Sequence, residues 1–291
     1  MIKTEQIKSF SIEDKDYPFL LKKIPRPPKI IYAKGDFPEN ELCFGIVGTR
    51  RFSSYGKQVA LEIAGDLAEA GLIIVSGLAP GIDTFVHRAV LERKKKTIAV
   101  LGTGLDEESL YPQSNIKLAR EIIEQGGSLI SEYPVGTRGT RFTFPQRNRI
   151  IAGLSLGILV IEGKLKSGSL ITANWAFSQK RKVFAVPGSI YSSNSKCSHH
   201  LIKRGAQLVE SAEDILRELN LPIRNKKEKL KGATKEENLI FKVLSEGALH
   251  VDEIIDKTRF PASTVNKNLI AMEINGKIKN LGGNIYAIDN R

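Results

Sequence analysis

The feature that most constrains the fold is a repeated alternation of short apolar runs with longer segments of helical periodicity. The alternation begins at residue 42, and glycine or serine bounds the apolar runs. These runs predict strands at residues 42–47, 72–75, 97–101, 128–130, 157–161, 182–186 and, more weakly, 207–209. Runs this apolar are typical of strands that are buried on both faces, as in a parallel sheet.

Helical segments separate the predicted strands. In residues 53–70 the apolar positions fall on one helical face, and Gly71 follows as a stop signal. Further helices are predicted at residues 81–93, 115–125, 146–154, 169–179, 198–204 and 212–219. This alternation predicts an α/β domain with an extended Rossmann-type, mostly parallel, doubly wound sheet.

The composition along the chain predicts four segments. Residues 1–40 hold several prolines and are expected to form an extended lead-in to the Rossmann-type domain at 41–220. Residues 221–234 are polar and lysine-rich, as in a linker. Residues 235–291 show three short helical patterns (235–245, 251–257, 263–274) and a hairpin that pairs 277–281 with 285–288, which predicts a small winged-helix domain.

Several classes of protein are excluded by the composition. The longest apolar stretch, 150–161, is shorter than the roughly 20 residues of a membrane span, and residues 1–10 lack the apolar core of a signal peptide. Only Cys43 and Cys197 occur, without metal-ligand spacing, and the adjacent His199 and His200 diverge on a helix. We therefore expect a cytoplasmic protein with no disulfide, metal, cofactor or membrane anchor.

The positive charge is concentrated in one segment. The chain carries 44 Lys and Arg residues against 32 Asp and Glu, a net charge of +12. Such a charge could serve solubility alone. However, residues 138–204 hold twelve Lys and Arg residues and the single acid Glu162, whereas the rest of the chain is nearly neutral. Because solvated surfaces normally mix both signs, this segment predicts a polyanionic partner.

Small residues follow the first three predicted strands, where a parallel sheet binds its ligands. Glycine lets the backbone approach a phosphate closely, so three such loops together predict an anion pocket. None of them completes a dinucleotide fingerprint or a Walker A sequence. The candidate residues of the three loops are Gly48, Arg50 and Arg51; Ser76, Gly77 and Gly81; and Gly102 and Gly104.

Two later segments add cations, hydroxyls and an aromatic ring, the groups that grip phosphates and stack on unpaired bases. The first contributes Arg141, Phe144, Arg147, Asn148 and Arg149, and the second contributes Lys164, Lys166, Ser167, Gly168, Ser169 and Thr172. Other roles stay open. Phe142 or Phe144 could pack in the core, and one of the two helical arginines could pair with Glu162 or Asp83. The i, i+4 pair Asp83 and His87 is better explained by a structural hydrogen bond than by acid–base chemistry.

A series of motifs resembles, in the same order, the bacterial DNA-processing protein A family (DprA/Smf). The motifs are YP at 17–18, KGD at 34–36, SGLAPGIDTFVH at 76–87, GTGLD at 102–106, YP at 111–112, SEYP at 131–134, FPQRNRIIAGLS at 144–155, SGSLITA at 167–173 and VPGS at 186–189. The resemblance covers roughly residues 17–219, and a winged-helix tail is also common in the family. Many members carry a helical N-terminal domain, whereas only about 40 residues precede the first predicted strand here.

The resemblance implies a non-enzymatic mediator. Such a protein binds and protects incoming single-stranded DNA in natural transformation, and loads a RecA-type recombinase onto it for homologous recombination. It also implies a homodimer. By resemblance, DNA binding is assigned to Arg50, Arg51, Phe144, Arg147, Asn148, Arg149, Ser167, Gly168 and Thr172.

Two alternatives remain. The first is an enzyme of the related nucleotide-hydrolase type, which needs a carboxylate at the ribosyl transition state. Residues 163–175 contain no acid, so its candidates are Asp83, Asp106 and Glu132. The second concerns the winged helix, whose third helix leaves Asn266, Lys267 and Glu273 outward. Because this is a poor base-reading surface, a protein partner is as good an expectation as DNA.

Overall fold

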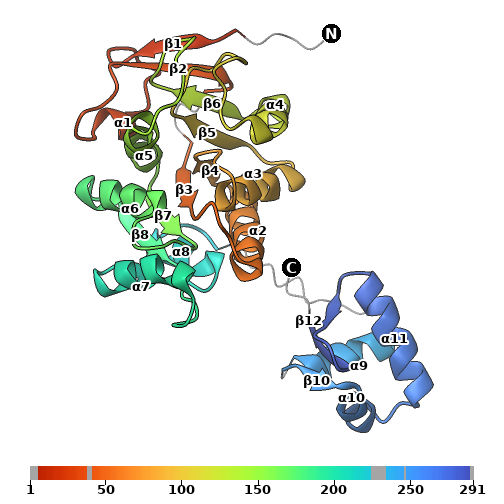
Figure 1. Ribbon diagram of the computed structural model, residues 1–291. Coiled ribbons are helices and arrows are strands. Elements are labelled where there is room, and N and C mark those ends of the chain that lie inside the picture. Colours follow the sequence, from red (N-terminus) through yellow and green to blue (C-terminus); the bar gives the residue numbers. More distant parts are fainter. Residues whose placement is uncertain (1–5, 38–40, 224–233, 246, 289–291) are drawn as a thin grey trace. The chain divides into compact units, whose positions relative to one another are not determined.

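The computed structural model describes residues 6–37, 41–223, 234–245 and 247–288 of the chain. The chain divides into two compact units, Met1–Ile223 and Arg224–Arg291. Figure 1 labels the elements of both units.

The first unit is built on one mixed sheet. Within the described residues the sheet has nine strands in the order β1-β2-β6-β5-β4-β3-β7-β8-β9, and the seven from β6 to β9 are parallel. The predicted α/β fold with a mostly parallel, doubly wound sheet is therefore confirmed. The strands are β1 (Lys8–Ser11), β2 (Ile30–Gly35), β3 (Cys43–Val47), β4 (Ile73–Ser76), β5 (Thr97–Leu101), β6 (Ser128–Ser131), β7 (Gly157–Val160), β8 (Lys182–Ala185) and β9 (Gln207–Leu208).

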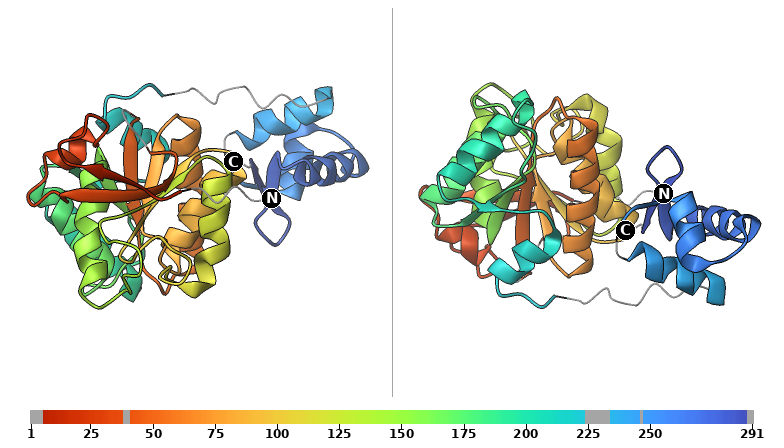
Figure 2. Two further views of the ribbon diagram at one scale, coloured as in Figure 1. Left: turned by 90° about the horizontal axis from the view of Figure 1, so that it is seen from above. Right: turned by 90° about the horizontal axis from the view of Figure 1, so that it is seen from below.

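Helices cover both faces of this sheet (Figure 2). Because successive side chains of a strand point to opposite faces, Cys43 and Val47 of β3 join one core, whereas Phe44 and Ile46 join the other. The first face carries α1 (Phe19–Lys22), α5 (Thr143–Leu154), α6 (Gly168–Ser178) and α7 (Lys196–Lys203). The second carries α2 (Ser54–Glu69), α3 (Ile82–Glu92), α4 (Ile116–Glu124) and α8 (Ala212–Glu218).

The strand order reverses at β3. From β3 the chain adds β4, β5 and β6 on one side, and then crosses to add β7, β8 and β9 on the other. The helices that follow the adjacent strands β3 and β7, α2 and α6, therefore lie on opposite faces of the sheet. In open α/β sheets such a switch point leaves a crevice at the carboxyl ends of the strands, where ligands bind.

The segment before β3 is more structured than the sequence predicts. Instead of an extended lead-in, β1 and β2 form an antiparallel pair, and β2 pairs with β6, the last of the parallel strands on that side. Between these strands, Tyr17, Leu21 and Ile24 are buried against the first core. The sequence signal is weak because β1 reads KSFS, with one apolar residue, and proline-rich chain precedes β2.

The second unit has the predicted winged-helix arrangement. It comprises α9 (Lys235–Leu244), β10 (Leu249–His250), α10 (Val251–Thr258), α11 (Ala262–Ile274), β11 (Ile278–Asn280) and β12 (Ile285–Ile288), with its described strands in the order β10-β12-β11. Val265, Leu269 and Met272 of α11 are buried in the core of this unit. Residues 224–233 of the predicted linker lie outside the described residues. No helix in the described parts of the chain is long and apolar enough to span a membrane.

Candidate functional site

A pocket of about 510 Å³ lies at the switch point, beyond the carboxyl ends of β3 and β7. It brings together side chains from four segments that are distant in sequence. Twelve of the predicted residues line it: Gly48, Arg50, Arg51, Phe144, Arg147, Asn148, Lys164, Lys166, Ser167, Gly168, Ser169 and Thr172. The lining also includes Val47, Thr49, Ala79, Asp83, Pro145, Ile151 and Ile171.

The loop between β3 and α2 supplies two exposed cations, Arg50 and Arg51. The start of α3 packs against the backbone of this loop, because Ile82 N donates a hydrogen bond to Thr49 O at 3.2 Å. Gly81 permits this approach, since a Cβ there would lie 2.4 Å from Thr49 O, and its φ of +91° also favours glycine. The loop ends at Ser53, whose side chain caps α2 by accepting a hydrogen bond from Gly56 N.

The loop between β7 and α6 supplies Lys164 and Lys166, which are also exposed. Ser167 caps α6 and its Oγ lies 2.7 Å from Ser169 Oγ. Nothing lies within 4 Å of the position that a Cβ would take on Gly168, so the backbone at the start of α6 is open to a ligand. A helix N-terminus with hydroxyls and lysines beside it binds anions.

Phe144 adds an aromatic group to this lining. Its ring is partly buried and contacts the Tyr111 ring at a centroid distance of 5.4 Å. The neighbouring Phe142 is 67% exposed. Neither ring belongs to the buried core, so both stay accessible for stacking. A pocket that combines four exposed cations, a helix N-terminus and an aromatic ring suits an unpaired nucleic acid strand.

Arg147 lines the pocket from inside the protein. It is 5% exposed, and its Nη1 donates to the carbonyl oxygens of Gly77, at 2.7 Å, and Val100. Burial lowers the pKa of Arg147 to about 10, against the attraction of the Asp83 carboxylate. These contacts tie α5 to the ends of β4 and β5. Arg147 therefore organises the pocket floor, whereas the sequence predicts a side chain that grips phosphate.

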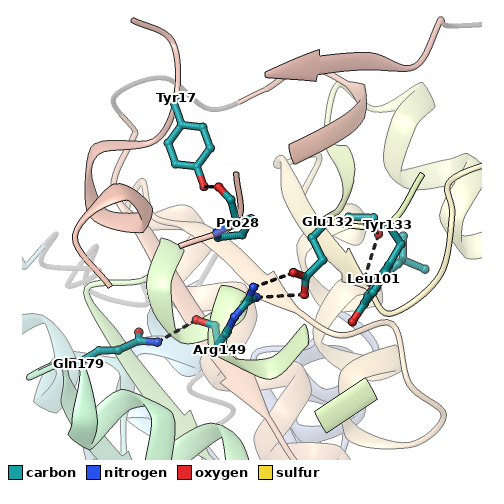
Figure 3. Close-up of polar contacts among 8 residues, drawn as sticks. Tyr17, Pro28, Leu101, Glu132, Tyr133, Arg149 and Gln179 are labelled. Atoms are coloured by element: carbon teal, nitrogen blue, oxygen red, sulfur yellow. Dashed lines mark hydrogen bonds and ion pairs between the residues drawn. The ribbon is translucent and has the colours of Figure 1, made fainter. Parts of the chain in front are cut away.

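Arg149 points away from the pocket. Its Nη1 and Nη2 donate to the two carboxylate oxygens of Glu132 at 3.0 and 2.6 Å, as Figure 3 shows. The pairing with Glu162 or Asp83 that the sequence left open does not form for this residue. Residues two positions apart on a helix face different sides, so Arg147 and Arg149 cannot both meet one ligand. The same figure shows Gln179 donating to Arg149 O.

Besides Arg149, five small residues and one further arginine of the predicted site lie outside the lining. Ser76 Oγ donates to Ile46 O, and Gly77 N donates to Asp83. Gly81 supports the β3–α2 loop, as described above. Gly102 packs against the start of α5, and Gly104 N donates to Thr137 O. These five residues contact neighbouring parts of the protein and do not line the pocket. Arg141 is exposed and lies over the Phe142 ring.

The carboxylates that a nucleotide hydrolase would need are engaged in structural contacts. Asp83 accepts hydrogen bonds from Gly77 N and Ala79 N, and burial raises its pKa while Arg147 opposes the rise. Asp106 accepts from Gly136 N, and Glu132 pairs with Arg149. His87 bonds Thr97 rather than Asp83, and burial lowers the pKa of His87 to about 3.

Seven lining residues were not among the predicted binding residues, although the sequence analysis named one of them, Asp83, for other roles. Thr49 stands between two residues that were chosen, and its Oγ1 accepts a hydrogen bond from Arg51 N, so its position in the loop was a usable signal. The apolar members, such as Ile151 and Ile171, carry no signal that distinguishes them from core residues. Among the described residues, no cluster of His, Cys, Asp and Glu could hold a metal ion.

Comparisons with known proteins show which family this chain is similar to. A family model described as DNA recombination-mediator protein A matches residues 8–220, and one described as DprA winged helix domain matches residues 224–284. DNA processing protein DprA of Bacillus subtilis (strain 168) is 45% identical over 221 residues, which make up 75% of this chain and 73% of that protein.

Two solved structures are similar to this chain over three quarters of its length. DNA processing protein A from Streptococcus pneumoniae aligns with a TM-score of 0.68 at 43% identity, and the alignment covers 75% of this chain and 76% of that one. DNA processing protein A from Helicobacter pylori, whose structure describes a single-stranded DNA binding mode, aligns with a TM-score of 0.66 at 30% identity. That alignment covers 75% of this chain and 97% of the other.

Proposed function

The chain belongs to the DNA recombination-mediator protein A family, and from this premise we propose that it binds single-stranded DNA in the switch-point pocket. The observation that carries the proposal is the meeting of two cation-bearing loops at the N-terminus of α6. Arg50 and Arg51 come from one loop, and Lys164 and Lys166 come from the other. The single-stranded DNA binding described for the H. pylori relative supports the same ligand.

A single strand suits the pocket better than a duplex. The pocket is a small hollow at a strand crevice, and Phe144 offers a ring inside it. In a duplex the bases are paired and stacked on one another, so none is free to meet this ring. An unpaired base can stack on it while the neighbouring phosphates meet the four cations. The proposed role is binding and protection of the strand, with no chemical step.

Binding to an oligodeoxynucleotide should be strongly salt-dependent. Each phosphate that a cation neutralises contributes about −0.7 to the slope of log K against log salt for single strands, so four cations predict a slope near −3. A fluorescence anisotropy titration at several salt concentrations measures this slope. A duplex of the same sequence serves as the control and should bind more weakly. Absence of salt-sensitive binding to the single strand would refute the proposed function.

We further propose that the chain acts as a homodimer and passes the bound strand to a RecA-type recombinase. The family description as a recombination mediator supports this step, and two pockets on one dimer would add their contacts to one strand. Light scattering should give about twice the chain mass of 32.2 kDa. Addition of the protein should also shorten the lag before RecA hydrolyses ATP on single-stranded DNA. A monomer would contradict the first proposal, and an unchanged lag the second.

A further inference from the structure

Glu162 is the single acid in the basic segment 138–204, and it is buried at 4% exposure just after β7. Its carboxylate accepts hydrogen bonds from Ser53 Oγ at 2.6 Å and from Ser53 N at 3.0 Å. It also accepts one from Asn194 Nδ2 at 3.4 Å. These donors are neutral groups, although lysines and arginines surround Glu162 in sequence. Its contacts therefore join the β7 end to the base of the Arg50–Arg51 loop.

Asn194 completes this connection. Its Nδ2 also donates to Arg51 O at 2.9 Å, and its own backbone oxygen accepts from Gly163 N at 2.7 Å. One residue thus bonds the loop that carries Arg51 and the loop that carries Lys164. Neither Asn194 nor Glu162 lines the pocket. They lie behind the two loops, where they can act on a ligand only through the cations.

The first turn of α2 packs tightly against the same carboxylate. A Cβ on Gly56 would lie 2.3 Å from Glu162 Oε2, so glycine is needed for this approach. The positive end of the α2 dipole and the amide of Ser53 stabilise the buried negative charge. The Glu162 carboxylate therefore has a fixed position. A side chain that positions the two loops needs such a fixed position.

We propose that Glu162 and Asn194 are positioning residues that hold the Arg50–Arg51 loop and the Lys164–Lys166 loop at a fixed separation, matched to one strand of DNA. The proposal rests on the proposed function and deepens it. Loops that are already ordered in the free protein lose little conformational entropy when DNA binds. Their cations therefore bind phosphates more tightly than the same cations on flexible loops would. The single acid in the basic segment then strengthens DNA binding.

The sign of the effect separates this role from simple electrostatics. Removal of a negative charge beside a polyanion site should strengthen binding if charge alone matters. If Glu162 positions the loops, its removal should weaken binding. Glu162→Gln distinguishes further, because its carbonyl oxygen can still accept from Ser53 N and Asn194, while its amide can donate to Ser53 Oγ. This conservative variant should restore most of the affinity that Glu162→Ala loses.

The test measures single-stranded DNA affinity at several salt concentrations, and thermal unfolding, for the full chain and its variants. We expect Glu162→Ala and Asn194→Ala each to weaken binding by about tenfold, the scale expected when one or two long side chains must be ordered on binding. Their double variant should lose little more than either single variant, because both act through one contact. Asp36→Ala is the matched control, since this exposed acid pairs with Lys96 at the amino end of β5, whereas the pocket lies beyond the carboxyl ends of β3 and β7.

Weaker binding by folded Glu162→Ala, with recovery in Glu162→Gln and no loss in Asp36→Ala, supports the proposal. Wild-type or tighter binding by Glu162→Ala overturns it. If Glu162→Ala does not fold, Asn194→Ala decides in the same way. Should the wild type itself show no salt-sensitive binding, the proposed function fails, which is a different result from intact binding that ignores Glu162.

Discussion

Replacement of both Lys164 and Lys166 by alanine should weaken single-stranded DNA binding by roughly 50- to 100-fold near 50 mM salt. Both side chains are exposed on the pocket lining, beside the open N-terminus of α6. Each lysine that no longer neutralises a phosphate removes about 0.7 from the steepness of the salt dependence, so the slope should flatten by about 1.4. Anisotropy titrations at several salt concentrations measure both quantities.

The matched control for this double variant removes the same charge elsewhere. Lys94 and Lys95 are exposed between α3 and the amino end of β5, whereas the pocket lies beyond the carboxyl ends of β3 and β7. Their double replacement by alanine should change affinity little, because they make no contact with the bound strand. If both double variants lose affinity equally, bulk charge rather than the pocket governs binding. Unfolding temperatures should stay close to wild type in both, since exposed lysines contribute little to stability.

Arg149→Ala should lower the free energy of unfolding of the first unit by about 3 to 5 kcal/mol. The Arg149 and Glu132 side chains are 6% and 12% exposed, and they form a bidentate pair. The alanine variant leaves the Glu132 carboxylate buried without its cation, which is the costly outcome for such pairs. Urea denaturation followed by the fluorescence of Trp175 measures this, because the single tryptophan lies in the first unit.

Two variants control this prediction. Arg149→Met with Glu132→Leu removes both charges, and should recover most of the lost stability because no buried ion is left unpaired. Arg120→Ala breaks the exposed pair with Glu107, and should cost below about 1 kcal/mol. If Arg149→Ala costs no more than Arg120→Ala, the buried pair has no special importance. DNA affinity of the folded fraction should be kept in all of them, because Arg149 points away from the pocket.

Much of the fold could be predicted from the sequence because its central strands are buried on both faces. The runs at 43–47 and 97–101 are continuous apolar segments, and glycine or serine ends them clearly. The edge strands β1 and β2 were not predicted. β2 pairs with β6, which is distant in sequence, and β1 pairs with β2, so no local pattern specifies their place in the sheet. Winged-helix elements were predictable because their contacts are local.

The candidate site could be predicted only in part. The loops after β3 and β7 follow from the rule that parallel sheets bind ligands at strand ends. The roles of single residues depend on what folds against them. Gly102 is covered by the start of α5, and Arg147 is buried among backbone carbonyls, neither of which a sequence pattern states. The charge count shows only that Glu162 is the single acid in the basic segment 138–204. Its hydrogen bonds to Ser53 and Asn194, which no sequence pattern predicts, place it between the two loops.

The pairing of β2 with β6 has a consequence for how the chain folds during synthesis. Tyr32 lies opposite Ser131, so an early-made strand must wait until β6 has left the ribosome before it finds its partner. During that interval β2 can pair with β1 alone, and its other side is exposed to wrong pairings. A nascent chain released before residue 131 would therefore lack this edge, and proteases should cleave it within the first 40 residues.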